Sequence, residues 1–216
     1  MTIKKIIKIL SQETKHFTPT LIEQIIKQHG KDPFIILICC LLSLRSKDNV
    51  TIHVCTNLLK IAKTPKQILN LKPSELEKII YKIGFYKNKA KILHKVSHEI
   101  LAKYNDKVPN NLKELLNLPG VGPKTANLVM GTAYDIPAIC VDIHAHRISN
   151  RLGIVNTKTP DETETALKKI IPKNDWIKFN NLLVKWGQNI CTPTSPWCSR
   201  CAIKTFCKRV GVKRSR

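Results

Sequence analysis

Apolar residues recur along this chain at helical spacing, and no segment of useful length alternates as a surface strand would. Leu21, Ile25 and Ile26 share one face of a helix that Gly30 ends. The same period recurs at residues 48–62, 73–83, 87–103, 111–118, 124–134, 142–152, 160–171 and 175–188. The chain is therefore predicted to be all-α.

Residues 34–44 are apolar on all sides, so periodicity alone does not separate a buried helix from a buried strand. Their length favours a helix, which Asp32 and Pro33 would open. Residues 136–141 are predicted to form a short extended connection. No low-complexity linker divides the chain, so composition alone gives no domain boundary.

Charge changes this picture most. The 216 residues include 37 Lys and Arg against 15 Asp and Glu, a net charge of +22, which favours a polyanionic partner such as nucleic acid. The longest apolar run, residues 34–42, is about half of the ~20 residues that a membrane span needs, so no membrane partner is expected. Lysines interrupt the N-terminal apolar residues, which argues against a secretory signal. We therefore expect a cytoplasmic, nucleoid-associated, prokaryote-like protein.

The eight cysteines fall into two groups. Four lie in apolar stretches, where cysteine is usually a small buried hydrophobe: Cys39, Cys40, Cys55 and Cys140. The other four have the spacing C-x6-C-x2-C-x5-C near the C-terminus: Cys191, Cys198, Cys201 and Cys207. Four thiolates at this range indicate one metal centre, and the spacing fits zinc and an iron–sulfur cluster equally well. A disulfide pair fits less well without a secretory signal.

Residues 118–124, Leu-Pro-Gly-Val-Gly-Pro-Lys, join two predicted helices through a tight turn. Gly120, Val121 and Gly122 would expose backbone amides to a ligand. Pro123 is a favoured first helical residue, so the helix N-terminus would face the same ligand. We interpret the turn as a hairpin that grips phosphate without reading bases. The alternative is an ordinary helix connection with a glycine cap.

Four side chains, one directly after this turn and three at the start of the next helix, are considered for chemistry. Lys124 lies in a first helical turn, where the helix dipole and partial desolvation would favour an uncharged, nucleophilic amine. Position alone still favours the alternative, an ordinary solvated lysine. Asp142 is predicted to cap the next helix with one oxygen while the other faces a cationic substrate. His144 and His146 are two residues apart, hence on different helix faces, so we interpret both as structural or phosphate-contacting rather than as a metal pair.

Together these segments resemble the endonuclease III family of DNA base-excision repair glycosylases. The resemblance covers about residues 21–207 and lies in residues 118–126, in Val141 and Asp142 with His144 and Arg147, and in the four-cysteine tail. Shorter matches occur at residues 32–34, 41–43, 83–86 and 89–90.

The resemblance implies a helix-hairpin-helix glycosylase fold. Residues 25–136 would form a six-helix barrel domain with the hairpin, and residues 1–24 and 137–216 a discontinuous iron–sulfur cluster domain, with a DNA cleft between them. It also implies that Cys191, Cys198, Cys201 and Cys207 hold a [4Fe-4S] cluster. The expected partner is double-stranded DNA with a damaged base or an abasic site, bound by a monomer.

The resemblance further implies a bifunctional DNA glycosylase/AP lyase. Lys124 would attack C1′ of a flipped-out damaged pyrimidine nucleotide and form a Schiff base, and Asp142 would stabilise the cationic sugar. Cleavage 3′ to the abasic site would follow by β-elimination. The residues expected to contact DNA are Ser43, Arg45, Phe85, Gly120, Val121, Gly122, His144 and Arg147.

The chain departs from the family pattern at several positions. Arg45 stands where the family often has Gln in the loop that fills the space of the flipped base, and Phe85 stands where a Leu wedge is frequent. The loop 192–197 has no basic residue, so the basic tail 208–216 is expected to supply charge instead.

Two alternative functions differ in their use of Lys124. A monofunctional mismatch (adenine or thymine) glycosylase generally lacks a lysine there. A non-enzymatic iron–sulfur DNA-binding module has no use for Lys124 or Asp142.

Overall fold

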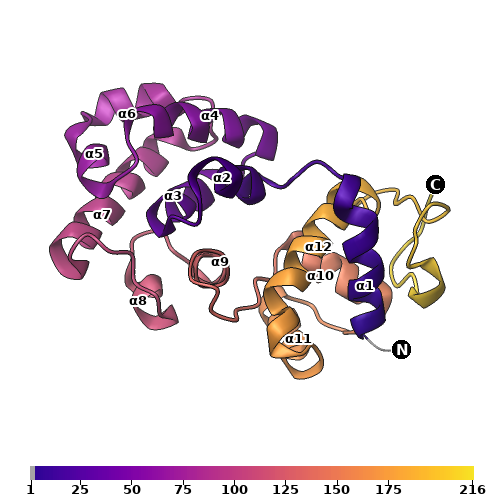
Figure 1. Cartoon of the computed structure of the whole chain (residues 1–216). Coiled ribbons are helices and arrows are strands. Elements are labelled where there is room, and N and C mark those ends of the chain that lie inside the picture. Colours follow the sequence, from indigo (N-terminus) through magenta and orange to yellow (C-terminus); the bar gives the residue numbers. More distant parts are fainter. Residues whose placement is uncertain (1–2) are drawn as a thin grey trace. The chain divides into compact units, whose positions relative to one another are not determined.

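The computed structural model describes residues 3–216 (Figure 1). Within those residues it contains twelve α-helices and three short 3-10 helices, and no strand, so the all-α prediction is confirmed. The chain divides into two compact units. One is Leu21–Ile136, and the other joins the residues up to Thr20 to Pro137–Arg216.

The unit 21–136 contains the helices α2 to α9. Their bounds are α2 Leu21–His29, α3 Pro33–Ser43, α4 Asp48–Ile61, α5 Pro65–Asn70, α6 Pro73–Ile80, α7 Tyr86–Tyr104, α8 Leu112–Asn117 and α9 Pro123–Ala133. The short helix α5 was not predicted, because its six residues are too few to show a period. Its start signal is nevertheless present, since the Thr64 side chain accepts from the Gln67 amide and Pro65 follows.

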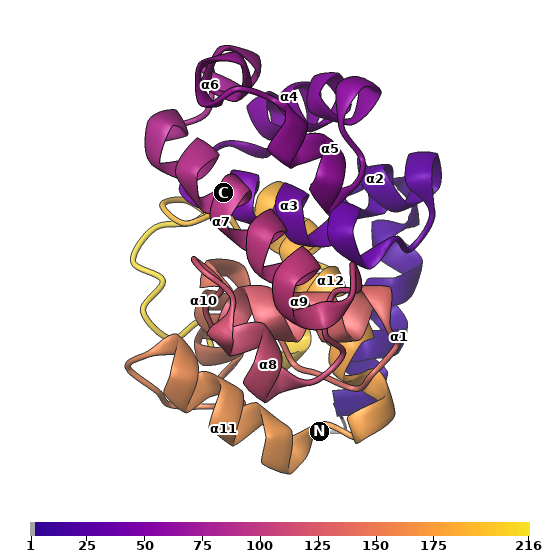
Figure 2. The ribbon, with the colours of Figure 1, turned by 90° about the vertical axis from the view of Figure 1, so that its left-hand side faces the viewer.

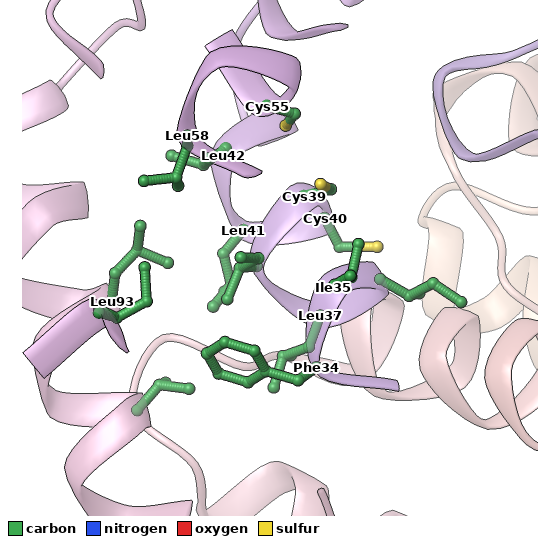
Figure 3. Packing of buried hydrophobic residues seen from close by; sticks show 14 of the residues in the cluster. Phe34, Ile35, Leu37, Cys39, Cys40, Leu41, Leu42, Cys55, Leu58 and Leu93 are labelled. Carbon is green, nitrogen blue, oxygen red and sulfur yellow. The ribbon is translucent and has the colours of Figure 1, made fainter. Parts of the chain in front are cut away.

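Helix α3 is the centre of this unit. Nine consecutive residues, 34–42, are buried, and α3 packs against α2, α4, α7 and α9. Figure 3 shows its side chains among Cys55 and Leu58 of α4 and Leu93 of α7. The segment is a helix rather than a strand, and it begins as predicted, because an Asp32 side-chain oxygen accepts from the Ile35 amide at 2.9 Å.

The other unit contains α1 (Ile3–Glu13), α10 (Ile143–Leu152), α11 (Pro160–Ile170) and α12 (Trp176–Asn189), with 3-10 helices at Thr14–His16, Lys173–Asp175 and Lys204–Phe206. Helix α12 packs against both α1 and α10 (Figure 1). Its Phe179 and Trp186 are the largest fully buried side chains of the unit. These contacts give the unit a hydrophobic core of its own.

The connection from Ile136 to Val141 contains neither helix nor strand, in line with the predicted extended piece. The predicted helix 73–83 ends earlier, at Ile80, because residues 81–85 turn sharply before α7. No helix within residues 3–216 is both long enough and apolar enough to cross a lipid bilayer.

Candidate active site and cysteine cavity

A short turn connects α8 to α9 (Figure 2). Its two glycines have different roles. Gly120 has φ +76°, and a Cβ there would lie 2.8 Å from the Ile92 Cγ2 of α7, so only glycine fits. Gly122 has extended φ −98°, and a Cβ there would meet nothing within 4 Å. Neither the turn nor its packing therefore requires glycine at position 122, whose bare backbone is open to another molecule.

The start of α9 has the features of an anion site. Gly122 is its N-cap and supplies no side chain for the first-turn amides, and Pro123 follows as the first helical residue. The first turn also contains no acidic residue. Neither the N-cap nor the first turn of α9 therefore supplies a negative group to the positive end of the helix dipole, which suits a bound anion.

Lys124 is the second residue of α9 and is exposed. The next two residues, Thr125 and Ala126, are buried, so the lysine extends from a well-anchored helix turn. The partial desolvation expected at Lys124 remains a prediction. Lys124 belongs to the unit 21–136 and Asp142 to the other unit.

Asp142 caps α10 as predicted. Its Oδ1 accepts from the His144 amide at 2.9 Å and from the Ala145 amide at 2.8 Å. Both bonds use the same oxygen, which leaves Oδ2 outside the cap. The side chain is nearly buried, at 8% exposure, while the following Ile143 is 68% exposed. Burial and two amide donors hold the carboxylate in one orientation.

His144 and Arg147 lie on the face of α10 that meets α12. The Arg147 Nη2 donates to the His144 Nδ1 at 3.0 Å, to the Gly187 carbonyl at 3.2 Å and to the Cys191 carbonyl at 2.8 Å. A Cβ at position 187 would overlap the His144 ring, so glycine is required there. Both side chains thus have partners within their own unit, and DNA contact by either remains a prediction.

His146 lies on a different face of α10, as its spacing from His144 predicted. Its Nδ1 is hydrogen-bonded to the Thr163 Oγ1 of α11 at 2.7 Å. The Asn150 amide donates to the His146 carbonyl at 2.9 Å and to the Thr157 Oγ1 at 3.1 Å. This network joins α10 to α11, which is a structural role.

The four C-terminal cysteines line one cavity. They are half-buried thiols with no disulfide: Cys191, Cys198, Cys201 and Cys207. The rest of the wall includes Arg151, Ile190 and Trp197. Within residues 3–216, no three His, Cys, Asp or Glu side chains meet closely enough for a single metal ion. Burial raises the pKa of the Cys201 and Cys207 thiols.

Arg151 connects α10 to the segments that carry the first and last of these cysteines, a role that was not predicted from the sequence. Its guanidinium donates to the Thr192 carbonyl at 2.7 Å and the Pro193 carbonyl at 2.5 Å. Its Nη1 also lies 3.3 Å from the Cys191 sulfur, and its own carbonyl lies 3.3 Å from the Cys207 sulfur. The sequence could have indicated this role, because Arg151 lies four residues after Arg147 and hence on the same face of the helix.

The basic tail also has local partners. Arg216 stacks on the Trp197 ring, with 3.9 Å from the guanidinium carbon to the ring centroid, and donates to the Ser195 carbonyl at 2.9 Å. Arg200 lies over the same ring at 5.3 Å. The tail therefore returns to the loop between the first two cysteines, and its predicted contact with DNA is untested.

A second cavity, within the unit 21–136, has Arg45 and Phe85 on its rim. Leu41, Leu44, Asn88, Lys89 and Ile92 line the rest. Arg45 is exposed at φ +55°, and Phe85 is 67% exposed at φ +59°. Left-handed backbone is uncommon for such residues and marks two sharply turned loops. The Ser43 hydroxyl, in contrast, bonds back to the Cys40 carbonyl at 2.7 Å.

Known proteins match this chain closely. The family model of the HhH-GPD superfamily base excision DNA repair protein matches residues 38–173. The chain is 44% identical over 177 residues to Endonuclease III of Thermotoga maritima, which covers 82% of this chain and 83% of the relative. It is 43% identical over 183 residues to Endonuclease III homolog 2, chloroplastic, of Arabidopsis thaliana, which covers 81% of this chain. Because the match covers 47% of that plant protein, the chain spans about half of its length.

A solved structure of a non-covalent Endonuclease III–DNA complex is similar over most of its length. The TM-score is 0.86 at 34% sequence identity, and the match covers 96% of this chain and 94% of that one. The family model spans more than half of the chain, and the Thermotoga relative is matched over most of both sequences. The chain therefore belongs to the endonuclease III family, within the HhH-GPD superfamily of base excision DNA repair proteins.

Proposed function

We propose that this protein is a bifunctional DNA glycosylase/AP lyase that removes oxidised or otherwise damaged pyrimidines as a monomer. The observation that carries the proposal is Lys124, a lysine in the first turn of α9 directly after the hairpin, in a chain of the endonuclease III family. A monofunctional glycosylase has no use for an amine nucleophile at this position, which makes that alternative the weaker one.

DNA binding begins at the hairpin. The open backbone at Gly122 and the N-terminus of α9, whose first turn carries no acidic residue, suit a phosphate of the DNA strand. The net charge of +22 supplies long-range attraction for the duplex. Contacts of this kind grip the strand without reading bases, which suits an enzyme that scans for damage. A damaged or abasic position is also easier to unstack than a normal pair.

In the first chemical step, the Lys124 amine attacks C1′ of the extruded nucleotide. The bond from C1′ to the damaged base breaks, and the base leaves with the bonding electron pair. Positive charge develops on the sugar as this bond weakens, and the Asp142 carboxylate, held by its cap, stabilises that charge. The oriented Oδ2 is the oxygen available for this role.

In the second step, the amine that is now bonded to C1′ loses a proton, the sugar ring opens at O4′, and an imine forms. The imine makes the C2′ proton acidic, and a base removes it. The 3′ phosphate then leaves with the electron pair of its C–O bond, and the strand is cut. Water as the nucleophile would give no imine and hence no cleavage.

We also propose that the cysteine cavity holds a [4Fe-4S] cluster. Four thiols without disulfides line one cavity, and four cysteine thiolates are the usual ligands of such a cluster: Cys191, Cys198, Cys201 and Cys207. The endonuclease III resemblance, rather than the cysteine spacing, is what favours a cluster over a single zinc ion here. When bound, the cluster supplies four metal–thiolate bonds that cross-link the C-terminal segment. The side chain of Arg151 holds the first cysteine loop beside it.

The proposal is tested by incubating the protein with duplexes that contain thymine glycol, other oxidised pyrimidines or mismatches. We expect release of oxidised pyrimidines and strand cleavage that leaves an unsaturated aldehyde on the 3′ end. Base release with an intact, alkali-labile strand would instead identify a monofunctional glycosylase. Binding without base release would identify a non-enzymatic module.

A further inference from the structure

Lys89 is a buried cation that no step of the proposed chemistry uses. It lies in the first turns of α7 with 7% of its surface exposed. Its position belongs to the apolar face of the helix, four residues before Leu93 and seven before Val96, both of which are fully buried. A lysine at a core position needs compensating partners, because burial of an unpaired ammonium is costly.

The partners of Lys89 are the end of α3 and the loop that follows it. The Nζ donates to the Leu42 carbonyl at 2.7 Å, to the Leu44 carbonyl at 2.6 Å and to the Ser46 Oγ at 3.1 Å. An ammonium has three donors, so all three are used. The last carbonyls of a helix have no partner in the helix, and a cation there also complements the dipole. One side chain therefore bonds the backbone just before Arg45 and the Ser46 hydroxyl just after it.

Lys89 is tied to the second loop as well. Its backbone amide donates to the Phe85 carbonyl at 3.0 Å, the first helical bond of α7. The two loops are also neighbours, because a Cβ at Gly84 would lie in ordinary van der Waals contact with the Arg45 carbonyl oxygen, at 3.5 Å. Arg45 and Phe85 both have left-handed backbone, which persists only where the surroundings enforce it. The Lys89 side chain thus holds the loop of Arg45 directly, and it does so from the first turn of the helix that follows the loop of Phe85.

We propose that Lys89 is a positioning residue that fixes Arg45 and Phe85 on the rim of one cavity, ready to enter the duplex beside an extruded nucleotide. The inference rests on the proposed function, since it assigns Lys89 a part in damage recognition by the same enzyme. Two loops held in place before binding avoid the entropy cost of ordering them on the DNA. Lys89 itself touches neither the DNA nor the reacting atoms.

The first test uses the free protein. In Lys89→Met, which keeps the length and burial of the side chain but removes all three donors, hydrogen exchange should accelerate in peptides that cover residues 43–47 and 84–89. Exchange in α9 should stay as in the wild type. Val96→Ala is the matched control, because it removes a buried side chain from the same helix without touching the two loops. Unchanged exchange in the loops of Lys89→Met would overturn the proposal.

The second test measures the consequence for DNA. The ratio of affinities for a duplex with a tetrahydrofuran abasic-site analogue and for the undamaged duplex should fall about tenfold or more in Lys89→Met. It should stay within about twofold of wild type in Val96→Ala. Ser46→Ala, which removes one of three acceptors, should fall between them. If the loops exchange faster but the affinity ratio stays unchanged, Lys89 is a purely structural residue and the inference is contradicted. An equal fall of the affinity ratio in Val96→Ala would contradict it as well.

These tests separate the inference from the proposed function. Borohydride trapping of wild-type protein on abasic DNA examines the lyase chemistry, which does not depend on Lys89. A wild type that never forms the covalent adduct would defeat the proposed function, whereas the exchange experiment would still decide whether Lys89 holds the loops. A wild type that is trapped, together with a Lys89→Met variant whose loops and affinity ratio are normal, would defeat the inference alone.

Discussion

The Arg147 Nη2 lies 2.8 Å from the carbonyl oxygen of Cys191, and this bond joins the helix that Asp142 caps to the first residue of the cysteine cavity. The same guanidinium also reaches the Gly187 carbonyl at 3.2 Å, near the end of α12. The cavity and the start of α10 therefore belong to one connected part of the unit. We expect changes in the cavity to reach the Asp142 carboxylate.

The metal assignment predicts that Cys198→Ser loses visible absorbance and bound iron. The thermal midpoint should also fall by several degrees, on the order of 5 °C, because four-thiolate ligation is part of the folding free energy. Cys140→Ala is the control, since Cys140 is buried in the connection 136–141 and does not line the cavity. Colourless wild-type protein, purified without oxygen and holding stoichiometric zinc, would contradict the cluster.

The two roles of Asp142 can be separated by Asp142→Asn. Asparagine is as good an N-cap as aspartate, so the thermal midpoint should change little. Base excision should fall about 10²–10³-fold, because the charge that stabilises the cationic sugar is lost. Asp142→Ala should lose the same activity and in addition about 1 kcal/mol of stability from the missing cap. Excision by Asp142→Asn at the wild-type rate would limit Asp142 to capping.

Arg45 should give the enzyme a preference for the base opposite the lesion. A guanidinium has only donors, and guanine offers it two acceptors, O6 and N7. We expect excision opposite guanine to be about tenfold faster than opposite adenine, and Arg45→Gln to lose most of this preference. Lys47→Gln removes an equal charge from an exposed position of the same loop and should keep it. An unchanged preference in Arg45→Gln would show that another residue senses this base.

Burial lowers the pKa of Lys89 from 10.5 to about 8, which predicts a pH dependence of stability. Between pH 8 and 10.5 the unfolded chain binds a proton that the folded chain does not, so this group makes the free energy of unfolding rise with pH. Below pH 8 the cost of burying the ammonium is fully present. From pH 8 to 10.5 the contribution of Lys89 to the free energy of unfolding rises by at most about 3 kcal/mol. Denaturant unfolding at pH 7.5 to 10 should show a smaller upward slope for Lys89→Met than for wild type, and identical slopes would contradict the shift.

Much of the fold follows from local signals in the sequence. The apolar run 34–42 and the cap at Asp32 were enough to predict α3, because length and capping chemistry are local properties. The Asp142 cap was predicted for the same reason. The short helix α5 was missed, because six residues show too little periodicity.

The functional site is harder to predict, because its side chains contact residues that are far away in the sequence. The sequence suggested DNA contact for Arg147, yet its donors go to carbonyls about 40 residues further along the chain. In the sequence, Lys89 stood out only as part of the family match at residues 89–90, because its partners lie more than 40 residues away, at the end of α3 and in the loop that follows it. The sequence pattern around a residue does not identify partners that lie so far along the chain.

The most direct test of the account is borohydride trapping on DNA that contains an abasic site or thymine glycol. The wild type should form a covalent adduct, because reduction fixes the imine between protein and sugar. Lys124→Ala should form none and retain its fold, since the side chain is exposed. Lys66→Ala, at an exposed lysine of α5, should be trapped like the wild type. Undiminished trapping of Lys124→Ala, or wild-type protein that binds this DNA and is never trapped, would contradict the central claim.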